Sequence, residues 1–373
     1  MLLGDGRDGD RDSLTARGAR TLTVCNACRY CEQYCPVFPA MEERTAFSRT
    51  DLAYLANLCH NCGECLYACQ YAPPHEFGID VPRRLAEIRV TSYEDYAWPR
   101  RLAWLFRSHS LMTAGVLVAV FSGWMLLLAR STGLPVQRVP PGGDFYAIIP
   151  HGAMVALFGG VFAFVVLAIA IGLARFLRDA GGRSEDRRRR TGAKGAAWRA
   201  LRDGMSLRHL HGNGADCVAA EEQRRPWRRW WHHVTLWGFL LCFASTTVAA
   251  IYHGVFGWVA PYAYTSAPVV LGSLGGVALL AGCAGLWTVR ARRDPALADP
   301  AQDGLDRSFI VLLFVTSLTG LALLVLRESF VMGRVLALHL GSVMALFLTL
   351  PYGKFVHGFY RLAALWVYER ERT

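Results

Sequence analysis

The sequence predicts a mainly α-helical fold in which a cysteine-rich head precedes a bundle of six membrane-spanning helices. Of the 373 residues, 53% are hydrophobic and 18% are charged. The mean hydropathy of +0.24 is high for a soluble protein. Eight of the eleven cysteines lie within the first 70 residues. From residue 110 onward, several almost uncharged stretches reach about 20 residues, the length of a bilayer-spanning helix.

Composition divides the chain into five segments. We expect a disordered tail over residues 1–20, a cysteine-rich domain over 21–90, a linker over 91–109, a membrane domain over 110–358 and a cytoplasmic tail over 359–373. The first segment lacks the apolar core of a secretory signal. We therefore expect the cysteines to remain in a reducing, cytoplasmic compartment.

Six segments have the length and composition of spanning helices. They are centred on residues 110–129, 147–174, 233–256, 267–289, 308–326 and 335–358. The second is longer than the hydrocarbon thickness requires, so we expect it to tilt or to project beyond the bilayer. The sixth contains Pro351, and a kink is expected there.

The charge of the loops predicts the orientation. The net charge is +11, and arginine supplies almost all of the positive charge. The loop over residues 175–231 carries fifteen Lys or Arg residues against seven acids, and the loop over 290–307 carries four arginines. Positive loops usually face the cytoplasm, so both termini are predicted to be cytoplasmic. A lipid or partner site is the alternative role for the first loop. No basic and aromatic module typical of nucleic-acid binding is visible.

The cysteines form two runs of the same spacing. The first run is C-x-x-C-x-x-C-x-x-x-C-P, and the second repeats it with Gln70 in place of the proline. In two-cluster ferredoxins, the fourth cysteine of each run binds the other cluster. We therefore predict one [4Fe-4S] cluster on Cys25, Cys28, Cys31 and Cys69, and a second on Cys59, Cys62, Cys65 and Cys35. Zinc is the alternative, but a zinc site does not need a third cysteine at the same interval. The other cysteines, Cys217, Cys242 and Cys283, are expected to be passive.

Histidines lie at or near the ends of the predicted spans. His339 and His357 are 18 residues apart, which is five helical turns on one face. His253 lies 21 residues after His232 and 20 after His233, and helical phase favours His232. The third and sixth spans run in opposite directions. We therefore predict two bis-histidine b-type haem sites, with His253 and His339 near the outer surface and His232 or His233 with His357 near the inner one.

Two further histidines are alternative ligands in this prediction. His151 enters the second span from outside and is an alternative outer ligand, and His109 is an alternative inner ligand. Any one of these histidines, taken alone, fits equally an interfacial side chain that is satisfied by water or headgroups. The pairing at matched depths is what favours haem.

Four segments carry a resemblance to a known family: CNACRYCEQYCPVFPA, CHNCGECLYACQYAPPHEFGIDVPRR, HHVTLWGFLLCFASTTVAAIYH and HLGSVMALFLTLPYGKFVHGFYR. Over about residues 20–368, the sequence resembles the CitB-type iron-sulfur and haem proteins, also called tricarballylate-utilization protein B. The membrane part is more distantly similar to the gamma subunit of respiratory nitrate reductase, a cytochrome b-type bundle. In that subunit the last helix carries two haem-ligating histidines, matched here by His339 and His357.

The resemblance implies a function in electron transfer. It implies a multi-pass protein of the bacterial inner membrane that takes electrons from a partner flavoprotein, tricarballylate dehydrogenase, and delivers them to the membrane quinone pool. The residues themselves show no paired general acid and base, no nucleophile arrangement and no phosphate loop, which favours a relay over substrate chemistry. No G-x-G-x-x-G follows a predicted strand, so FAD is expected on the partner.

Three interpretations stay open from the sequence. Tyr352 and Lys354 beside His357 are candidates for a quinone site, with interfacial anchoring as the alternative. The chain is also compatible with the membrane subunit of another dehydrogenase or of a disulfide-type reductase. A third hypothesis is an iron-sulfur redox sensor whose arginine-rich loop binds lipid or nucleic acid.

Overall fold

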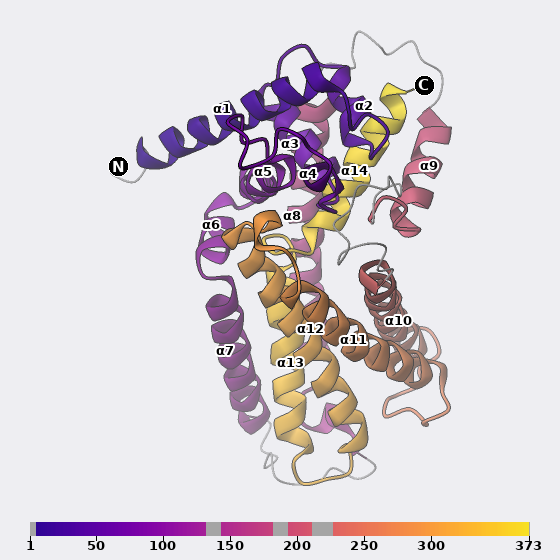
Figure 1. Cartoon of the computed structure of the whole chain (residues 1–373). Helices are drawn as coiled ribbons and strands as arrows, with labels where there is room; N and C mark the ends of the chain where they lie inside the picture. Colours follow the sequence, from indigo (N-terminus) through magenta and orange to yellow (C-terminus); the bar gives the residue numbers. More distant parts are fainter. Residues whose placement is uncertain (1–4, 132–142, 182–192, 211–226, 373) are drawn as a thin grey trace.

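The fold consists of a helical head on a set of long apolar helices. The computed structural model describes residues 5–131, 143–181, 193–210 and 227–372, and no β-strand occurs within those ranges. The head contains α1 (Asp5–Cys28), α2 (Val37–Glu42), α3 (Arg49–Leu58), α4 (Glu64–Tyr67) and α5 (Val81–Tyr96). Figure 1 shows these helices above the long ones, with the C-terminal helix α14 (Val356–Glu371) among them. The predicted mainly α-helical class is confirmed.

Six helices are long and apolar enough to cross a membrane. They are α7 (Ser110–Ser131), α8 (His151–Gly181), α10 (Trp227–Gly254), α11 (Ala267–Ala291), α12 (Pro300–Val325) and α13 (Met332–Thr349). The predicted number of spans is therefore confirmed. The fifth begins earlier than predicted, because the Asp299 carboxylate accepts a hydrogen bond from the Gln302 backbone amide and Pro300 occupies the first turn.

The prediction of one continuous sixth helix is wrong. Helix α13 ends at Thr349, and α14 begins at Val356. The backbone amides of Tyr352 and Gly353 both donate to the Thr349 carbonyl, at 3.1 and 2.8 Å. Because Pro351 has no backbone N–H and clashes with the preceding turn, the helix stops there instead of bending. His339 and His357 therefore lie on different helices, and the five-turn count between them does not apply.

The N-terminal segment predicted to be disordered is helical from Asp5 onward. Helix α1 lies against α5: Arg11 forms ion pairs with Glu94 at 2.8 Å and Asp95 at 3.2 Å, and Leu22 is 1% exposed. The polar composition of this segment did not indicate that it packs against α5. Residues 1–4 lie outside the described part of the chain.

The expected linker and C-terminal tail are also helices that pack on the head. The linker region contains the end of α5 and α6 (Arg100–Ser108), and α14 packs against α3, α8 and α9 (Ala193–Met205). One continuous apolar core runs from Tyr54 in α3 to Leu312 in α12 and Ala345 in α13. The head is therefore held at a fixed position over one end of the membrane helices.

Helices α10 and α11 pack closely through glycine. A Cβ atom added to Gly282 would lie 2.9 Å from the Thr235 backbone nitrogen and against its hydroxyl oxygen. We expect Gly282→Leu to separate the two helices and to destabilise the protein by roughly 1–3 kcal/mol, the usual cost of overpacking. Thermal unfolding in detergent measures the change. Gly160→Leu in α8 is the control, because nothing lies within 4 Å of that position, and an equal loss in both variants would contradict the prediction.

Candidate functional site

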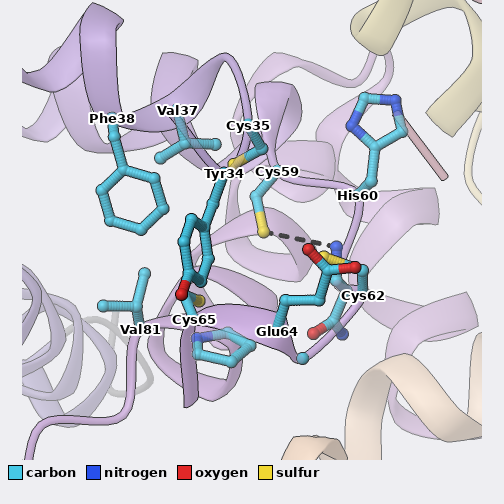
Figure 2. Close-up of a pocket in the computed structure, with 13 residues that line it drawn as sticks. Tyr34, Cys35, Val37, Phe38, Cys59, His60, Cys62, Glu64, Cys65 and Val81 are labelled. Atoms are coloured by element: carbon cyan, nitrogen blue, oxygen red, sulfur yellow. Dashed lines mark hydrogen bonds between the residues drawn. The ribbon is translucent and has the colours of Figure 1, made fainter. Parts of the chain in front are cut away.

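Four cysteines face one cavity in the head (Figure 2). Cys59 and Cys62 lie in the loop between α3 and α4, Cys65 lies in α4, and Cys35 precedes α2. Gly63 has a φ of 92°, which a residue with a side chain rarely adopts, and this turn directs the loop around the cavity. Tyr34, Val37, Phe38 and Val81 also line it. The structure thus brings together the four residues predicted for the second cluster.

The other four predicted cysteines also gather. Burial and the nearby thiols of Cys69, Cys31 and Cys28 raise the pKa of Cys25 to about 12. Cys69, from the second run, therefore lies with three cysteines of the first run. Burial and the neighbouring Cys62 and Cys59 likewise raise the pKa of Cys35. Both runs exchange their fourth cysteine, as in two-cluster ferredoxins.

The two cysteine sites differ in depth. Cys28 of the first site is exposed, whereas Cys59 of the second is buried. The second site also contacts the loop between α11 and α12, because the Asn61 side chain donates to the Leu297 carbonyl at 3.4 Å and the Tyr67 hydroxyl donates to Asp294 at 3.0 Å. The first site therefore faces solvent, and the second faces the membrane helices.

The donor set fits a [4Fe-4S] cluster at each site. Backbone amides donate to sulfur: that of Asn61 to Cys59 Sγ at 3.3 Å, those of Val37 and Phe38 to Cys35, and that of Glu64 to Cys62. Such bonds stabilise the thiolates that bind iron-sulfur clusters. Within the described residues, no three His, Cys, Asp or Glu side chains converge on the spacing that a single metal ion needs. In a cubane, each thiolate binds a different iron.

The inner histidines form a pair with the separation that a shared haem iron needs. The ring centres of His232 in α10 and His357 in α14 are 6.0 Å apart. With metal–nitrogen bonds of about 2 Å, two imidazoles on one metal place their ring centres about 6 Å apart. His357 Nδ1 donates to the Lys354 carbonyl at 2.5 Å, which leaves its Nε2 free as a ligand. His233 Nε2 instead donates to the Met205 carbonyl at 3.3 Å, so the geometry favours His232.

The predicted outer pair is not assembled. His253 stacks on His151 with ring centres 3.7 Å apart, and Tyr146 packs on both rings. Rings stacked this closely leave no room for a metal between them. His339 Nδ1 instead donates to the Thr319 hydroxyl oxygen at 3.1 Å, and none of the ring contacts in the described chain joins His339 to His253. The alternative inner ligand His109 is exposed between α6 and α7.

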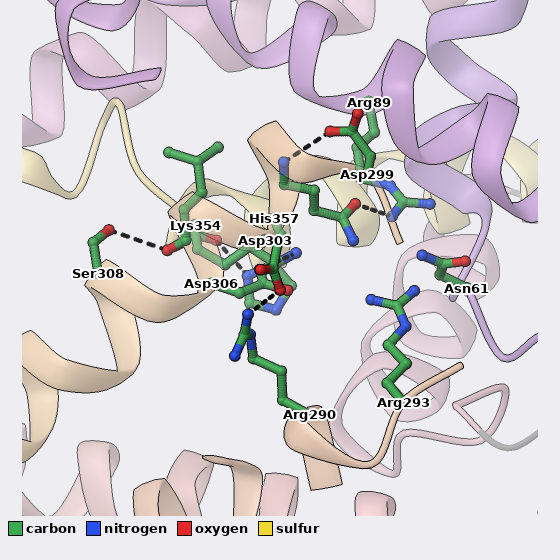
Figure 3. A network of polar contacts seen from close by, with 12 residues as sticks. Asn61, Arg89, Arg290, Arg293, Asp299, Asp303, Asp306, Ser308, Lys354 and His357 are labelled. Carbon is green, nitrogen blue, oxygen red and sulfur yellow. Dashed lines mark hydrogen bonds and ion pairs between the residues drawn. The ribbon is translucent and has the colours of Figure 1, made fainter. Parts of the chain in front are cut away.

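Sequence reasoning named Lys354 beside His357 but missed the arginines around the inner pair. Figure 3 shows Lys354 beside His357, with Arg89 and Arg293 in the same polar network, and Lys354 forms an ion pair with Asp306 at 2.7 Å. The spacing held a signal that could have found two more of them, since Arg228 lies four residues before His232 and Arg361 four residues after His357. One helical turn in each case places the arginine on the same face as the histidine.

Some sequence predictions concern residues that the structure does not cover. Cys217 and the RRRR run at residues 187–190 lie outside the described residues. Cys242 lies in α10 and Cys283 in α11, both away from the two cysteine sites, and Cys283 is 1% exposed in the packed bundle.

Comparisons with known proteins agree with this division of the chain. Residues 18–95 match the family model of the citrate utilization protein B Fer4-like domain, and residues 105–373 match that of citrate utilization protein B. The citrate utilization protein B of Escherichia coli is 46% identical over 358 residues, which is 95% of this chain and 92% of that protein. No solved structure matches the chain. These comparisons do not show the more distant similarity to the gamma subunit of nitrate reductase. The resemblance to the CitB-type proteins is confirmed: the chain belongs to the citrate utilization protein B family.

Proposed function

We propose that this chain carries electrons from a partner flavoprotein dehydrogenase to the quinone pool of a bacterial inner membrane. The observation that carries the proposal is the order of the three sites along the molecule. An exposed cysteine site is followed by a buried one, and the loop of the buried site contacts the two helices that hold His232 and His357. This order is that of an electron relay from the surface of the head into the membrane domain.

The side chains of this chain supply the positions of the carriers. When bound, two [4Fe-4S] clusters and a b-type haem supply one-electron carriers, which empty a two-electron flavin in single steps. Cys28 holds the first site within reach of a partner, because it is exposed. Cys59 and its neighbours keep water from the second site, because they are buried in the head. His232 and His357 offer the inner haem site. A second haem on the outer imidazoles His151, His253 and His339 stays a prediction that the observed contacts of these side chains do not support.

The orientation follows from the arginines near the head. Arg290, Arg292, Arg293 and Arg307 lie at the ends of α11 and α12 that face the head. By the positive-inside tendency, that end of the bundle is cytoplasmic. The iron-sulfur head and both termini would then face a reducing compartment, where exposed thiolates and their clusters persist.

Neither Tyr352 nor Lys354, the two candidates from the sequence, is assigned to a quinone site in our proposal. The Tyr352 hydroxyl donates to the Trp98 carbonyl at 3.1 Å, and Lys354 is paired with Asp306. Both contacts join the last helix to the segments around it. Tyr352 and Lys354 therefore act as structural anchors in our proposal.

The partner's substrate is the part of the proposal that one assay decides. The name of the Escherichia coli relative refers to citrate utilization, and we propose tricarballylate dehydrogenase as the partner. Anaerobic membranes that contain this chain are mixed with that dehydrogenase and tricarballylate, and the b-type haem band is followed optically. We expect rapid haem reduction, and no reduction when either addition is left out. Reduction with a different flavoprotein and its substrate, but not with this pair, would contradict the assignment of the partner.

A further inference from the structure

The loop Cys59–Asn61 carries a cysteine of the second site and receives three arginines from three different helices. Arg89 of α5 donates to the Cys59 carbonyl at 2.7 Å, and Arg361 of α14 donates to the same carbonyl at 2.8 Å. Arg228 of α10 donates to the next two carbonyls of the loop, at 3.1 and 3.0 Å. We call Arg89, Arg228 and Arg361 the arginine collar. It surrounds the backbone that holds the second site.

The collar lacks anionic partners among the side chains that the structure describes. The acceptors of its guanidinium groups are backbone carbonyls and the side-chain oxygen of Gln302, which Arg89 contacts at 3.0 Å. Asp306, the carboxylate whose charge acts on Arg228, is already paired with Lys354, and the buried Glu64 lies on the cavity of the second site. Arg89 is 2% exposed, and Arg228 and Arg361 are partly buried. Burial of cations is costly unless an anion compensates for it.

The second cluster is the anion that fits this position. A cubane held by four thiolates carries net negative charge, and its charge becomes more negative by one on reduction. Cations that are fixed nearby in a buried environment therefore stabilise the reduced state more than the oxidised state. The three arginines come from α5, α10 and α14, so this charge is built into the packing of the head on the membrane domain.

The surroundings of the first site are different. Its adjacent charges in the sequence are Arg29 and Glu32, which have opposite signs and are both exposed. Solvent and salt screen such charges strongly. The first site therefore lacks a matching excess of buried positive charge from these neighbours.

Building on the proposed relay, we propose that the arginine collar raises the reduction potential of the second cluster above that of the first. One electron then leaves the first cluster and enters the second, and no bond forms or breaks. Arg228 lies one turn before His232 and Arg361 one turn after His357, so two collar residues connect the loop of the second site to the helices of the inner haem site. Its residues are positioning residues that give the relay its direction toward the membrane.

A redox titration of the purified full-length chain, followed by EPR, tests this proposal. The variants are Arg228→Gln and Arg361→Gln, and the control is Arg229→Gln, which removes a neighbouring arginine that donates to the Ser206 carbonyl. We expect each collar variant to lower the midpoint potential of one cluster by about 59 mV, which is a tenfold loss in the equilibrium toward that cluster. The shifted signal should be the one that Cys62→Ala removes.

The possible outcomes distinguish a failure of the collar proposal from a failure of the proposed function. Unchanged midpoints in both glutamine variants, with full iron content, or an equal shift in Arg229→Gln, would overturn the collar. Absence of both cluster signals in the wild type would instead overturn the proposed function. If a glutamine variant loses iron, the matched lysine variant decides: a retained midpoint supports the role of charge, and a shift toward lower potential with full iron content contradicts it.

Discussion

Replacing His357 with alanine is expected to remove one b-type haem per chain. The ring centres of His357 and His232 are 6.0 Å apart, the separation of two imidazoles that bind the same iron. His232→Ala should give the same loss. The haem-to-protein ratio of the purified variants measures it, together with the reduced-minus-oxidised optical band. Reduction of the remaining carriers by the flavoprotein should continue as far as the clusters, because the cysteine sites do not depend on either histidine.

His233→Ala is the matched control for this prediction. It removes the neighbouring imidazole of the same helix, whose Nε2 is occupied by the Met205 carbonyl. The variant should retain the haem of the inner site. If His233→Ala lost haem while His232→Ala kept it, the inner ligand pair would be His233 with His357. That result would contradict the assignment of His232.

Replacing Cys35 with alanine is expected to remove the second cluster, although Cys35 belongs to the first cysteine run. The reason is the exchange of fourth cysteines, which places Cys35 beside Cys59 and Cys62. Iron should fall from about eight to about four atoms per chain, the content of one cubane. The flavoprotein should no longer reduce the haem, whereas dithionite still should. Chemical analysis of iron and acid-labile sulfide measures the first effect, and the optical assay measures the second.

A buried cysteine outside the sites controls for general damage. Cys283→Ala changes a thiol that is packed in α11, so it should keep both clusters and haem reduction. Loss of the first cluster rather than the second in Cys35→Ala would contradict the exchange. It would also remove the order of sites on which the relay depends.

The sequence predicted the grouping of the cysteines well because the spacing within each run is local information. The spacing of each cysteine run determines which thiols can reach one cluster, and the structure brings Cys69 to the first run and Cys35 to the second. The six spans were equally predictable, since length and lack of charge identify them. In the first case the pattern lies within the first 70 residues, and in the second it lies within a single helix.

The prediction was less successful where long-range packing decides. A count of helical turns treated His339 and His357 as one face, but the break after Thr349 moved His357 into α14. The outer histidines were paired by depth alone, and depth does not report which helices are neighbours. Helix α1 and the arginine collar were missed because their partners, α5 and the loop at Cys59, are remote in the sequence.

EPR at low temperature on one purified sample, before and after reduction, tests the central claim most directly. The account predicts a low-spin ferric haem signal in the oxidised sample. In the reduced sample it predicts signals of two [4Fe-4S] clusters that interact magnetically, because the exchanged cysteines hold the clusters close together. A sample that contains zinc in place of iron and gives neither the haem signal nor the cluster signals would contradict the existence of the relay.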